Sequence, residues 1–261
     1  MIPLPSTGSA RPLSFSRRTG LLALGGGLLL AGCSGGPSVP TPTASLTGEI
    51  RDQLQAAIST IAAGQHKLGV AVQDLRSGAT WDFRGDWASQ SASMAKPMIV
   101  SMALRKARAD QLQQPLPAEQ EAQAQKAIKN SDNDSADALW TWAGARPSYD
   151  ALAKDLGLKN THSAQEKDFW SWTWTTPIDQ RSFLQQLVKG DTKALTDGER
   201  TYLLGLMGQV EEDQAWGVGT PRSAAVKVQL KNGWVQFQST DNLWAVNSIG
   251  HVSGDGRDYL L

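Results

Sequence analysis

Strand-like and helical segments alternate in a defined order between residues 48 and 261, and this order limits the folds open to the chain. A helical period over 46–63 is followed by an alternating segment at 68–75, a turn at 76–78 and a second strand at 79–83. Helices are predicted at 97–109, 118–129, 133–143, 147–156, 177–189 and 195–208, and strands at 225–230, 234–237, 243–249 and 257–261. Both ends of this region should therefore join one sheet, with a helical block inserted between them.

The predicted fold class is accordingly α/β, of the α+β sandwich kind. We expect an antiparallel sheet of about five strands, flanked by the N-terminal helix, with an inserted all-α subdomain. With 261 residues, of which 40% are hydrophobic, the chain is long enough to bury a proper core.

The first 32 residues are typical of a signal peptide. Arg17 and Arg18 form a charged region ahead of an apolar run at 21–31, which is well short of the ~20 apolar residues that span a bilayer. The paired arginines resemble a twin-arginine export signal. Leu30-Ala31-Gly32-Cys33 resembles a bacterial lipobox, in which Cys33 is acylated and becomes the mature N-terminus; a cleaved secretory peptide with an incidental cysteine is the alternative.

Residues 33–47 then form a flexible tether, because their Ser, Pro, Gly and Thr content is too polar to pack. These features predict an exported protein, held by a lipid anchor to the outer face of the bacterial cytoplasmic membrane. Its globular domain would cover 48–261.

Charge and cysteine content exclude several functions. Lysine plus arginine and aspartate plus glutamate each number 25, so the net charge is zero and no basic excess points to nucleic acid. The single cysteine excludes an internal disulfide and a cysteine-rich metal site. No metal and no cofactor is expected, and the protein is expected to be a monomer.

Three polar clusters stand in a suggestive order. Ser93 and Lys96 are three residues apart at the head of an apolar run, a spacing that chance alone often produces. Ser131-Asp132-Asn133 lies between two predicted helices, where such residues also serve as caps. Lys231-Asn232-Gly233 is followed by Trp234, and its Asn-Gly pair alone favours a hairpin turn between two strands.

Together, S-x-x-K, S-D-N and K-x-G in this order and context resemble the penicillin-recognising serine acyltransferases, specifically the class A β-lactamase branch. AIKNSDNDSAD at 127–137 and Trp174-Thr175-Thr176-Pro177 agree with that branch. QAWGV at 214–218 and VNSIG at 246–250 resemble exported serine hydrolases of actinobacteria. The resemblance runs from about residue 48 to 261 and implies a transpeptidase-like fold.

The resemblance also implies a role for each motif. Ser93 would be the nucleophile and Lys96 its general base, Ser131 would relay a proton to the leaving nitrogen, and Asn133 and Lys231 would bind substrate. Asn232 and Gly233 complete the third motif and would also bind substrate, with the Asn232 amide donating a hydrogen bond to the substrate carboxylate. The backbone N–H groups of Ser93 and Trp234 would form the oxyanion hole.

The chain departs from the family pattern at several points. Asn232 stands where the family has a Thr or Ser hydroxyl that binds the substrate carboxylate. No E-x-x-L-N string supplies a deacylating glutamate, so Glu166 is the candidate base, with Asp168 two residues further on. The helical block between Ser93 and Ser131 is short. The sequence reaches Leu261 without the family's closing helix.

Trp170, Trp172 and Trp174 alternate as one face of an extended segment would. Packing of a loop onto the body is the plain interpretation, and an aromatic wall for a sugar or peptide ligand is the sharper one.

The predicted function is an extracytoplasmic, β-lactamase-like serine hydrolase that is acylated on Ser93. Its substrates would be small molecules, either β-lactams or peptides derived from peptidoglycan. Two alternatives stay open: a penicillin-binding or peptidase-like protein with slow deacylation, and a non-catalytic cell-wall-binding lipoprotein. A Ser-His-Asp triad based on His66, His162 or His251 is a weaker enzyme hypothesis, because the chain has no G-x-S-x-G motif.

Overall fold

A computed structural model describes residues 46–64, 67–165, 168–236 and 243–261 of the chain. All of these residues belong to one unit, Pro40–Leu261. The predicted signal peptide, Cys33 and most of the tether lie outside the described residues, as do His66 and Glu166.

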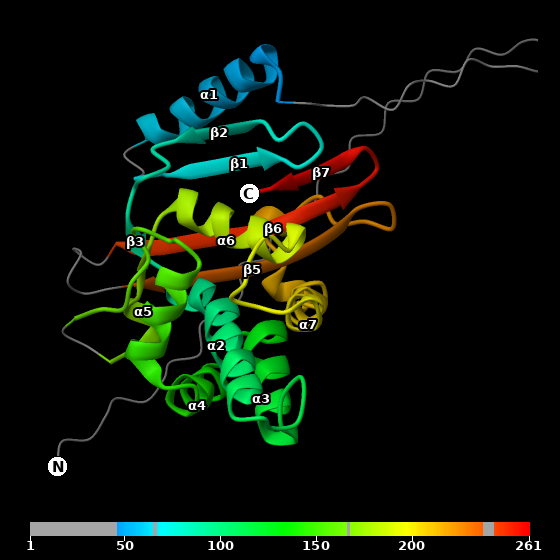
Figure 1. Cartoon of the computed structure of the whole chain (residues 1–261). Coiled ribbons are helices and arrows are strands. Elements are labelled where there is room, and N and C mark those ends of the chain that lie inside the picture. The colour runs from blue at the N-terminus through cyan, green and yellow to red at the C-terminus, as the bar shows by residue number, and fades with distance from the viewer. Residues whose placement is uncertain (1–45, 65–66, 166–167, 237–242) are drawn as a thin grey trace, which may run out of the picture. The chain divides into compact units, whose positions relative to one another are not determined.

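The helices and strands follow the predicted order closely (Figure 1). The helices are α1 (Gly48–Ala63), α2 (Lys96–Ala109), α3 (Ala118–Lys129), α4 (Asn133–Trp142), α5 (Ala145–Asp155), α6 (Pro177–Lys189) and α7 (Asp197–Met207). The strands are β1 (Val70–Asp74), β2 (Thr80–Phe83), β3 (Ser89–Gln90), β4 (Trp174–Thr175), β5 (Lys227–Gln236), β6 (Trp244–Gly254) and β7 (Arg257–Leu260). Short 3₁₀ turns are η1 (Ala92–Ala95), η2 (Trp170–Trp172), η3 (Glu212–Gln214) and η4 (Gly217–Gly219).

Five strands form one antiparallel sheet in the order β2-β1-β7-β6-β5, so both ends of the described region share it, as predicted. β3 and β4 form a separate two-stranded sheet. The α6 helix lies across one face of the large sheet (Figure 1). The helical block α2–α5 is inserted between β3 and β4, and α2 lies at its centre in contact with α3, α4, α5 and α7.

Local sequence signals explain where several helices begin and end. Thr196 and Glu199 form a capping box at the start of α7, each side chain bonding the other residue's backbone N–H. Thr176 caps α6 ahead of Pro177, and Gly190 ends that helix with a φ of 76°, a conformation that glycine adopts without strain.

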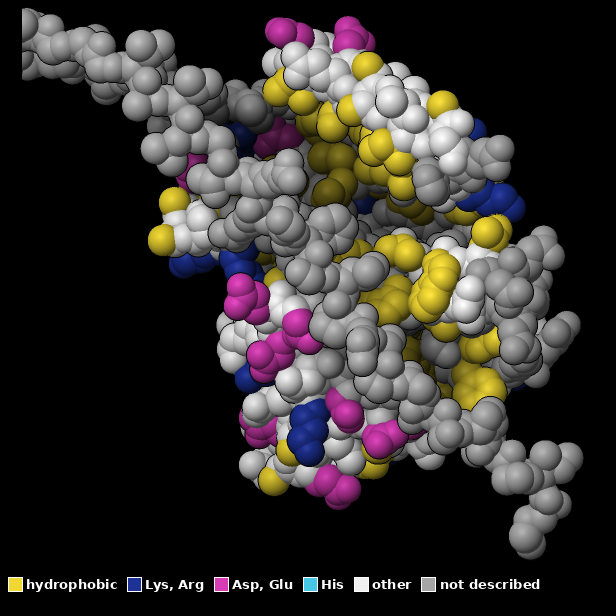
Figure 2. Space-filling model, turned by 180° about the vertical axis from the view of Figure 1, so that it is seen from behind, with side chains coloured by type: hydrophobic (Ala, Val, Ile, Leu, Met, Phe, Trp, Pro, Cys, Tyr) yellow, Lys and Arg dark blue, Asp and Glu magenta, His cyan; other side chains and the backbone are white. Residues whose placement is uncertain are grey.

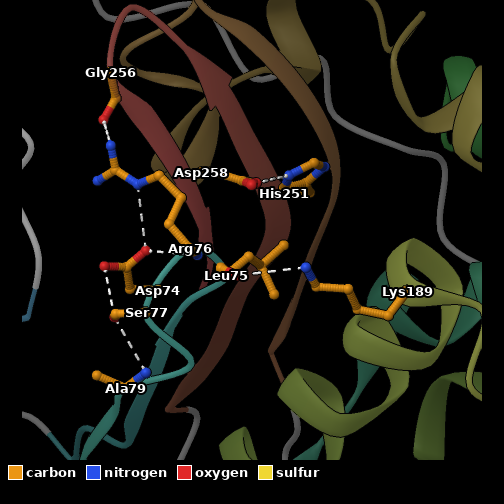
Figure 3. Close-up of polar contacts among 9 residues, drawn as sticks. All are labelled: Asp74, Leu75, Arg76, Ser77, Ala79, Lys189, His251, Gly256 and Asp258. Atoms are coloured by element: carbon orange, nitrogen blue, oxygen red, sulfur yellow. Dashed lines mark hydrogen bonds and ion pairs between the residues drawn. The ribbon is translucent and has the colours of Figure 1, made fainter.

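Polar contacts join the β1–β2 turn to the β6–β7 hairpin (Figure 3). Asp74 accepts hydrogen bonds from the backbone N–H of Arg76 at 3.0 Å and from the Ser77 hydroxyl at 2.8 Å, which fixes the turn. Arg76 donates from its guanidinium to the carbonyl of Gly256. The sheet's two sequence-distant halves are thus joined at this end by side chains as well as by the ladder between β1 and β7.

An apolar cavity of about 520 Å³ lies between α1 and the sheet, on the side of the molecule that Figure 2 shows. Leu54 and Ile58 of α1 line it, as do Val70 and Val72 of β1 and Val246 of β6. Figure 2 shows hydrophobic side chains gathered along this hollowed face.

Two local expectations were wrong. β5 runs unbroken through Lys231, Asn232 and Gly233, so the Asn-Gly pair forms no hairpin turn. The pairing of every β5 residue with β6 overrides the local turn preference. Trp170 and Trp172 lie in the 3₁₀ turn η2, and only Trp174 is in a strand, so the three do not form one extended face.

Among the residues described, no helix is both long and apolar enough to cross a membrane. The described residues also hold no cluster of three or more His, Cys, Asp or Glu side chains suited to a metal ion.

Candidate active site

The S-x-x-K motif forms a single 3₁₀ turn that leads into α2. Lys96, the first residue of α2, donates its backbone N–H to the carbonyl of Ser93. Residues three apart in such a turn eclipse one another, so both side chains lie on one face. Ala92, just before Ser93, has a φ of 49°, a conformation that costs a non-glycine residue about 1–3 kcal/mol.

The corner between α3 and α4 brings the S-D-N motif onto Lys96. The Lys96 ammonium donates to the carbonyl of Ser131, to the Ser131 hydroxyl at 3.3 Å and to the Asn133 side-chain oxygen at 2.9 Å. Asp132 caps α4 by accepting from the backbone N–H of Ser135 at 2.8 Å. Asp132 therefore forms the cap, and its neighbours Ser131 and Asn133 face Lys96.

Lys231 approaches the same hydroxyl from β5. Its ammonium donates to the Ser131 hydroxyl at 2.9 Å and to the carbonyl of Asn232 at 2.8 Å. A serine hydroxyl has two acceptor positions and one donor. When both lysines donate to Ser131, its own hydrogen is left to bond a third group, such as a leaving nitrogen.

Burial makes these two lysines unusually acidic. Both side chains are fully buried. Burial lowers the pKa of Lys96 to about 7, although the charges of Asp132 and Asp137 act in the opposite direction. Burial, and then the positive charge of Lys96, lower the pKa of Lys231 to about 7. At neutral pH each lysine therefore has access to both its proton-donating and its proton-accepting form.

Gly233 packs directly on the turn η1, which contains Ser93. A Cβ atom at this position would lie 2.5 Å from the backbone nitrogen of Met94 and 2.7 Å from that of Ser93. Only glycine permits this approach. It places β5 beside the backbone N–H of Ser93, with Trp234 the next residue along the strand, as a two-donor oxyanion hole requires.

Asn232 is fully buried and points into the protein. Its side-chain N–H groups donate to the carbonyls of Gln214 and Trp216, both at 2.8 Å. Both donors of the amide are thereby used. Asn232 therefore contacts the loop ahead of η4. Its amide has no free N–H with which to make the predicted hydrogen bond to a substrate carboxylate.

The structure thus brings together Ser93, Lys96, Ser131, Asn133, Lys231, Gly233 and Trp234, which come from η1, α2, the α3–α4 corner and β5. Within the described residues, none of the three hydrogen bonds of Lys96 reaches the Ser93 hydroxyl. Catalytic hydrogen bonds often tighten only when substrate binds.

Three residues have contacts beside this site that the sequence did not predict. The Trp170 ring lies 4.7 Å from the Lys96 ammonium, and Trp216 packs edge-to-face on Trp234 at 5.7 Å. Asn247 donates to the carbonyls of Gln90 and Ser91, which fixes the chain ahead of Ser93 to β6. Trp216 and Asn247 belong to segments that carried the family resemblance, whereas alternation alone gave no signal for the position of Trp170.

The histidines of the alternative triad have other partners. The imidazole of His251 bonds Asp258 at 2.8 Å and Gln229 at 2.9 Å, and that of His162 bonds the backbone carbonyl of Ser163. Asp168 accepts a hydrogen bond from the indole of Trp140 at 3.2 Å.

A family model described as the beta-lactamase enzyme family matches residues 119–260, more than half of the 261-residue chain. The chain belongs to the beta-lactamase enzyme family. No curated protein matches it.

Solved class A β-lactamases share the fold of this beta-lactamase family member. The beta-lactamase from Sphaerobacter thermophilus aligns with a TM-score of 0.66 at 17% identity, covering 80% of this chain and 86% of that chain. The TLA-3 extended-spectrum beta-lactamase gives 0.68 at 19% identity, covering 80% and 88%. The class A beta-lactamase from Mycobacterium abscessus gives 0.61 at 20% identity, covering 74% and 82%. The predicted class A β-lactamase-like fold is confirmed.

Proposed function

We propose that this protein is a serine hydrolase that forms an acyl-enzyme on Ser93 with β-lactams or related amides. The observation that carries the proposal is the Ser131 hydroxyl, which accepts hydrogen bonds from two fully buried lysines beside the S-x-x-K turn. Among the described residues, no carboxylate forms an ion pair with either ammonium group, and burying two such groups without one is costly for a site with a purely structural role.

Acylation follows from these positions. Neutral Lys96 takes the proton of Ser93 as its oxygen attacks the carbonyl carbon, and the backbone N–H groups of Ser93 and Trp234 stabilise the oxyanion. The carbon–nitrogen bond then breaks, and Ser131 gives its proton to the leaving nitrogen. Lys96, 3.3 Å from the Ser131 hydroxyl, replaces that proton with the one taken from Ser93.

Substrate binding would use two exposed side chains and the charge of the buried Lys231. Asn133 is exposed and can bond a substrate amide, while protonated Lys231 attracts a carboxylate. The Trp234 side chain is 43% exposed and, with Trp216, offers an aromatic surface for an apolar substituent.

The direct test is intact-mass spectrometry of the full chain with benzylpenicillin, sampled from seconds to hours, beside Ser93→Ala. We expect a mass gain of one benzylpenicillin on the natural protein and none on Ser93→Ala. If a folded natural protein gains no mass and leaves the drug intact, the acyl-enzyme proposal is wrong and the non-catalytic binding alternative gains support.

Export and lipid anchoring at Cys33 stay predictions from the sequence. Fatty-acid labelling of the natural chain beside Cys33→Ser tests them, and equal labelling of both would exclude acylation at this cysteine.

A further inference from the structure

Trp170 occupies the space beside the Lys96 ammonium. Its ring centre is 4.7 Å from the Lys96 nitrogen, and the side chain is only 6% exposed. The hydrogen bonds of Lys96 run to Ser131 and Asn133, and the indole ring packs against the same ammonium group. An aromatic face offers neither a base nor a strong acceptor for a water molecule at this position.

Several contacts fix the indole in place. Its N–H donates to a carboxylate oxygen of Asp137 in α4. Its backbone carbonyl accepts from the Thr173 hydroxyl at 2.8 Å, and that buried hydroxyl also bonds the Ser91 hydroxyl at 3.1 Å. Trp170 is thereby tied both to the helical block and to the chain two residues ahead of the nucleophile.

Three carboxylates near the site, among the residues that the structure describes, have other partners. Asp132 accepts the backbone N–H of Ser135, Asp137 accepts the Trp170 indole and Asp168 accepts the Trp140 indole. To release an acyl group, a water oxygen must attack the ester carbon while a base takes its proton, and the bond to the Ser93 oxygen then breaks as that oxygen regains a proton. The buried Trp170 ring lies against Lys96, the base that could serve this water.

We propose that Trp170 is a positioning residue that closes the Lys96 side of the acyl-enzyme to water, so that the ester on Ser93 is released slowly. The proposal rests on the proposed function and specifies the fate of the acyl-enzyme: the protein retains its acyl group rather than turning over rapidly. Slow hydrolysis gives an acyl acceptor other than water time to reach the ester.

The test follows the benzylpenicillin adduct on the full chain by intact mass, in the natural protein, Trp170→Ala and Trp170→Leu. Trp170→Leu retains apolar bulk in case the smaller side chain impairs folding. We expect both variants to acylate on Ser93 and to shed the adduct at least about tenfold faster, since a base-assisted water contributes about 10²–10⁴ to such a step. Structural damage alone would slow acylation and would not create faster hydrolysis.

Two further variants sharpen the result. Trp140→Phe is the matched control, because Trp140 is also buried and also donates its indole N–H to an aspartate, and it should leave the adduct lifetime unchanged. Asp137→Leu removes the anchor of Trp170 and should shorten the lifetime. A longer lifetime would instead make Asp137 the base for water and would overturn the proposal.

Unchanged lifetimes in both Trp170 variants, with acylation retained, would also overturn the proposal while leaving acylation on Ser93 intact. So would a natural protein that sheds its adduct within seconds. If the natural protein forms no adduct and leaves the drug intact, the proposed function fails and this proposal fails with it; if it forms no lasting adduct but hydrolyses the drug, only this proposal fails.

Discussion

At the residue scale, two lysines and one serine hydroxyl form the centre of the candidate active site. Lys96 and Lys231 are fully buried, and both donate to Ser131. Burial lowers the pKa of each lysine to about 7, so each can gain or lose a proton near neutral pH. A base or proton relay needs this property. Two residues of this region, Ala92 next to Ser93 and Ser131 itself with a φ of 59°, have a strained left-handed backbone conformation. Such a conformation persists only where the surrounding structure holds it in place.

The pKa values of these lysines predict the pH dependence of acylation. Lys96 loses its proton as pH rises through about 7, so the acylation rate constant should increase from pH 6 to pH 8. Lys231 also loses its charge near pH 7, so the affinity for an anionic β-lactam should fall over the same range. Because the two sites interact, the titration belongs to the pair. Stopped-flow acylation by a chromogenic cephalosporin separates the two effects.

Lys231→Arg is the matched variant for this prediction. Arginine keeps its charge throughout this range, so the affinity should no longer decline while the rise in rate persists. A rate constant that does not change between pH 6 and pH 8 would remove Lys96 from the role of base.

At the scale of elements, the close contact between β5 and η1 assembles the site. Every residue of β5 pairs with β6 along one edge of the strand. At Gly233, β5 also contacts the turn η1, which contains Ser93. This contact joins Ser93 and Gly233, which are about 140 positions apart in the chain.

Gly233→Ala should therefore damage catalysis. Its Cβ would press on the backbone nitrogens of Met94 and Ser93, which cannot move aside as a flexible side chain could. We expect acylation to slow by roughly 10²-fold, as removal of an oxyanion donor does. Gly205→Ala is the control: Gly205 is exposed within α7, and a Cβ there meets nothing within 4 Å.

Gly205→Ala should raise the free energy of unfolding by about 0.5–1 kcal/mol, because alanine is the better helix former, and should leave acylation unchanged. Acylation kinetics and urea unfolding of both variants provide the comparison. Equal acylation by Gly233→Ala and the natural protein would contradict the assignment of this contact to the oxyanion hole.

At the scale of the whole molecule, β7 joins the two ends of the described region. It pairs with β1 on one side and with β6 on the other, and Leu260 is fully buried between them. The helical block is inserted in the chain between β1 and β6, the two strands that β7 joins. The sheet and the site therefore both depend on the pairing of β7 with these strands.

Leu260→Ala should lower the free energy of unfolding by about 2–5 kcal/mol, the usual cost of a cavity at a fully buried leucine. Equilibrium urea unfolding measures it, with Leu112→Ala as the control because Leu112 is 39% exposed and should change stability by no more than about 0.5 kcal/mol. A loss at Leu260 as small as that at Leu112 would show that β7 adds little to the fold.

The sequence by itself determined the element order, most helix bounds and the motif residues. Hydrophobic periodicity is a local property, so the helices at 118–129 and 177–189 could be predicted to the residue. Ordered motifs led from Ser93, Lys96 and Ser131 to the correct family, which the match over residues 119–260 shows.

Only the tertiary structure decided which atoms meet. Local turn preference favoured a hairpin at Asn232-Gly233, and pairing of β5 with β6 overrode it. Burial set the pKa values of Lys96 and Lys231, used both N–H groups of Asn232 inside the protein and placed Trp170 against Lys96. Such contacts join residues far apart in the chain, and their energies depend on solvent exclusion that no local pattern encodes.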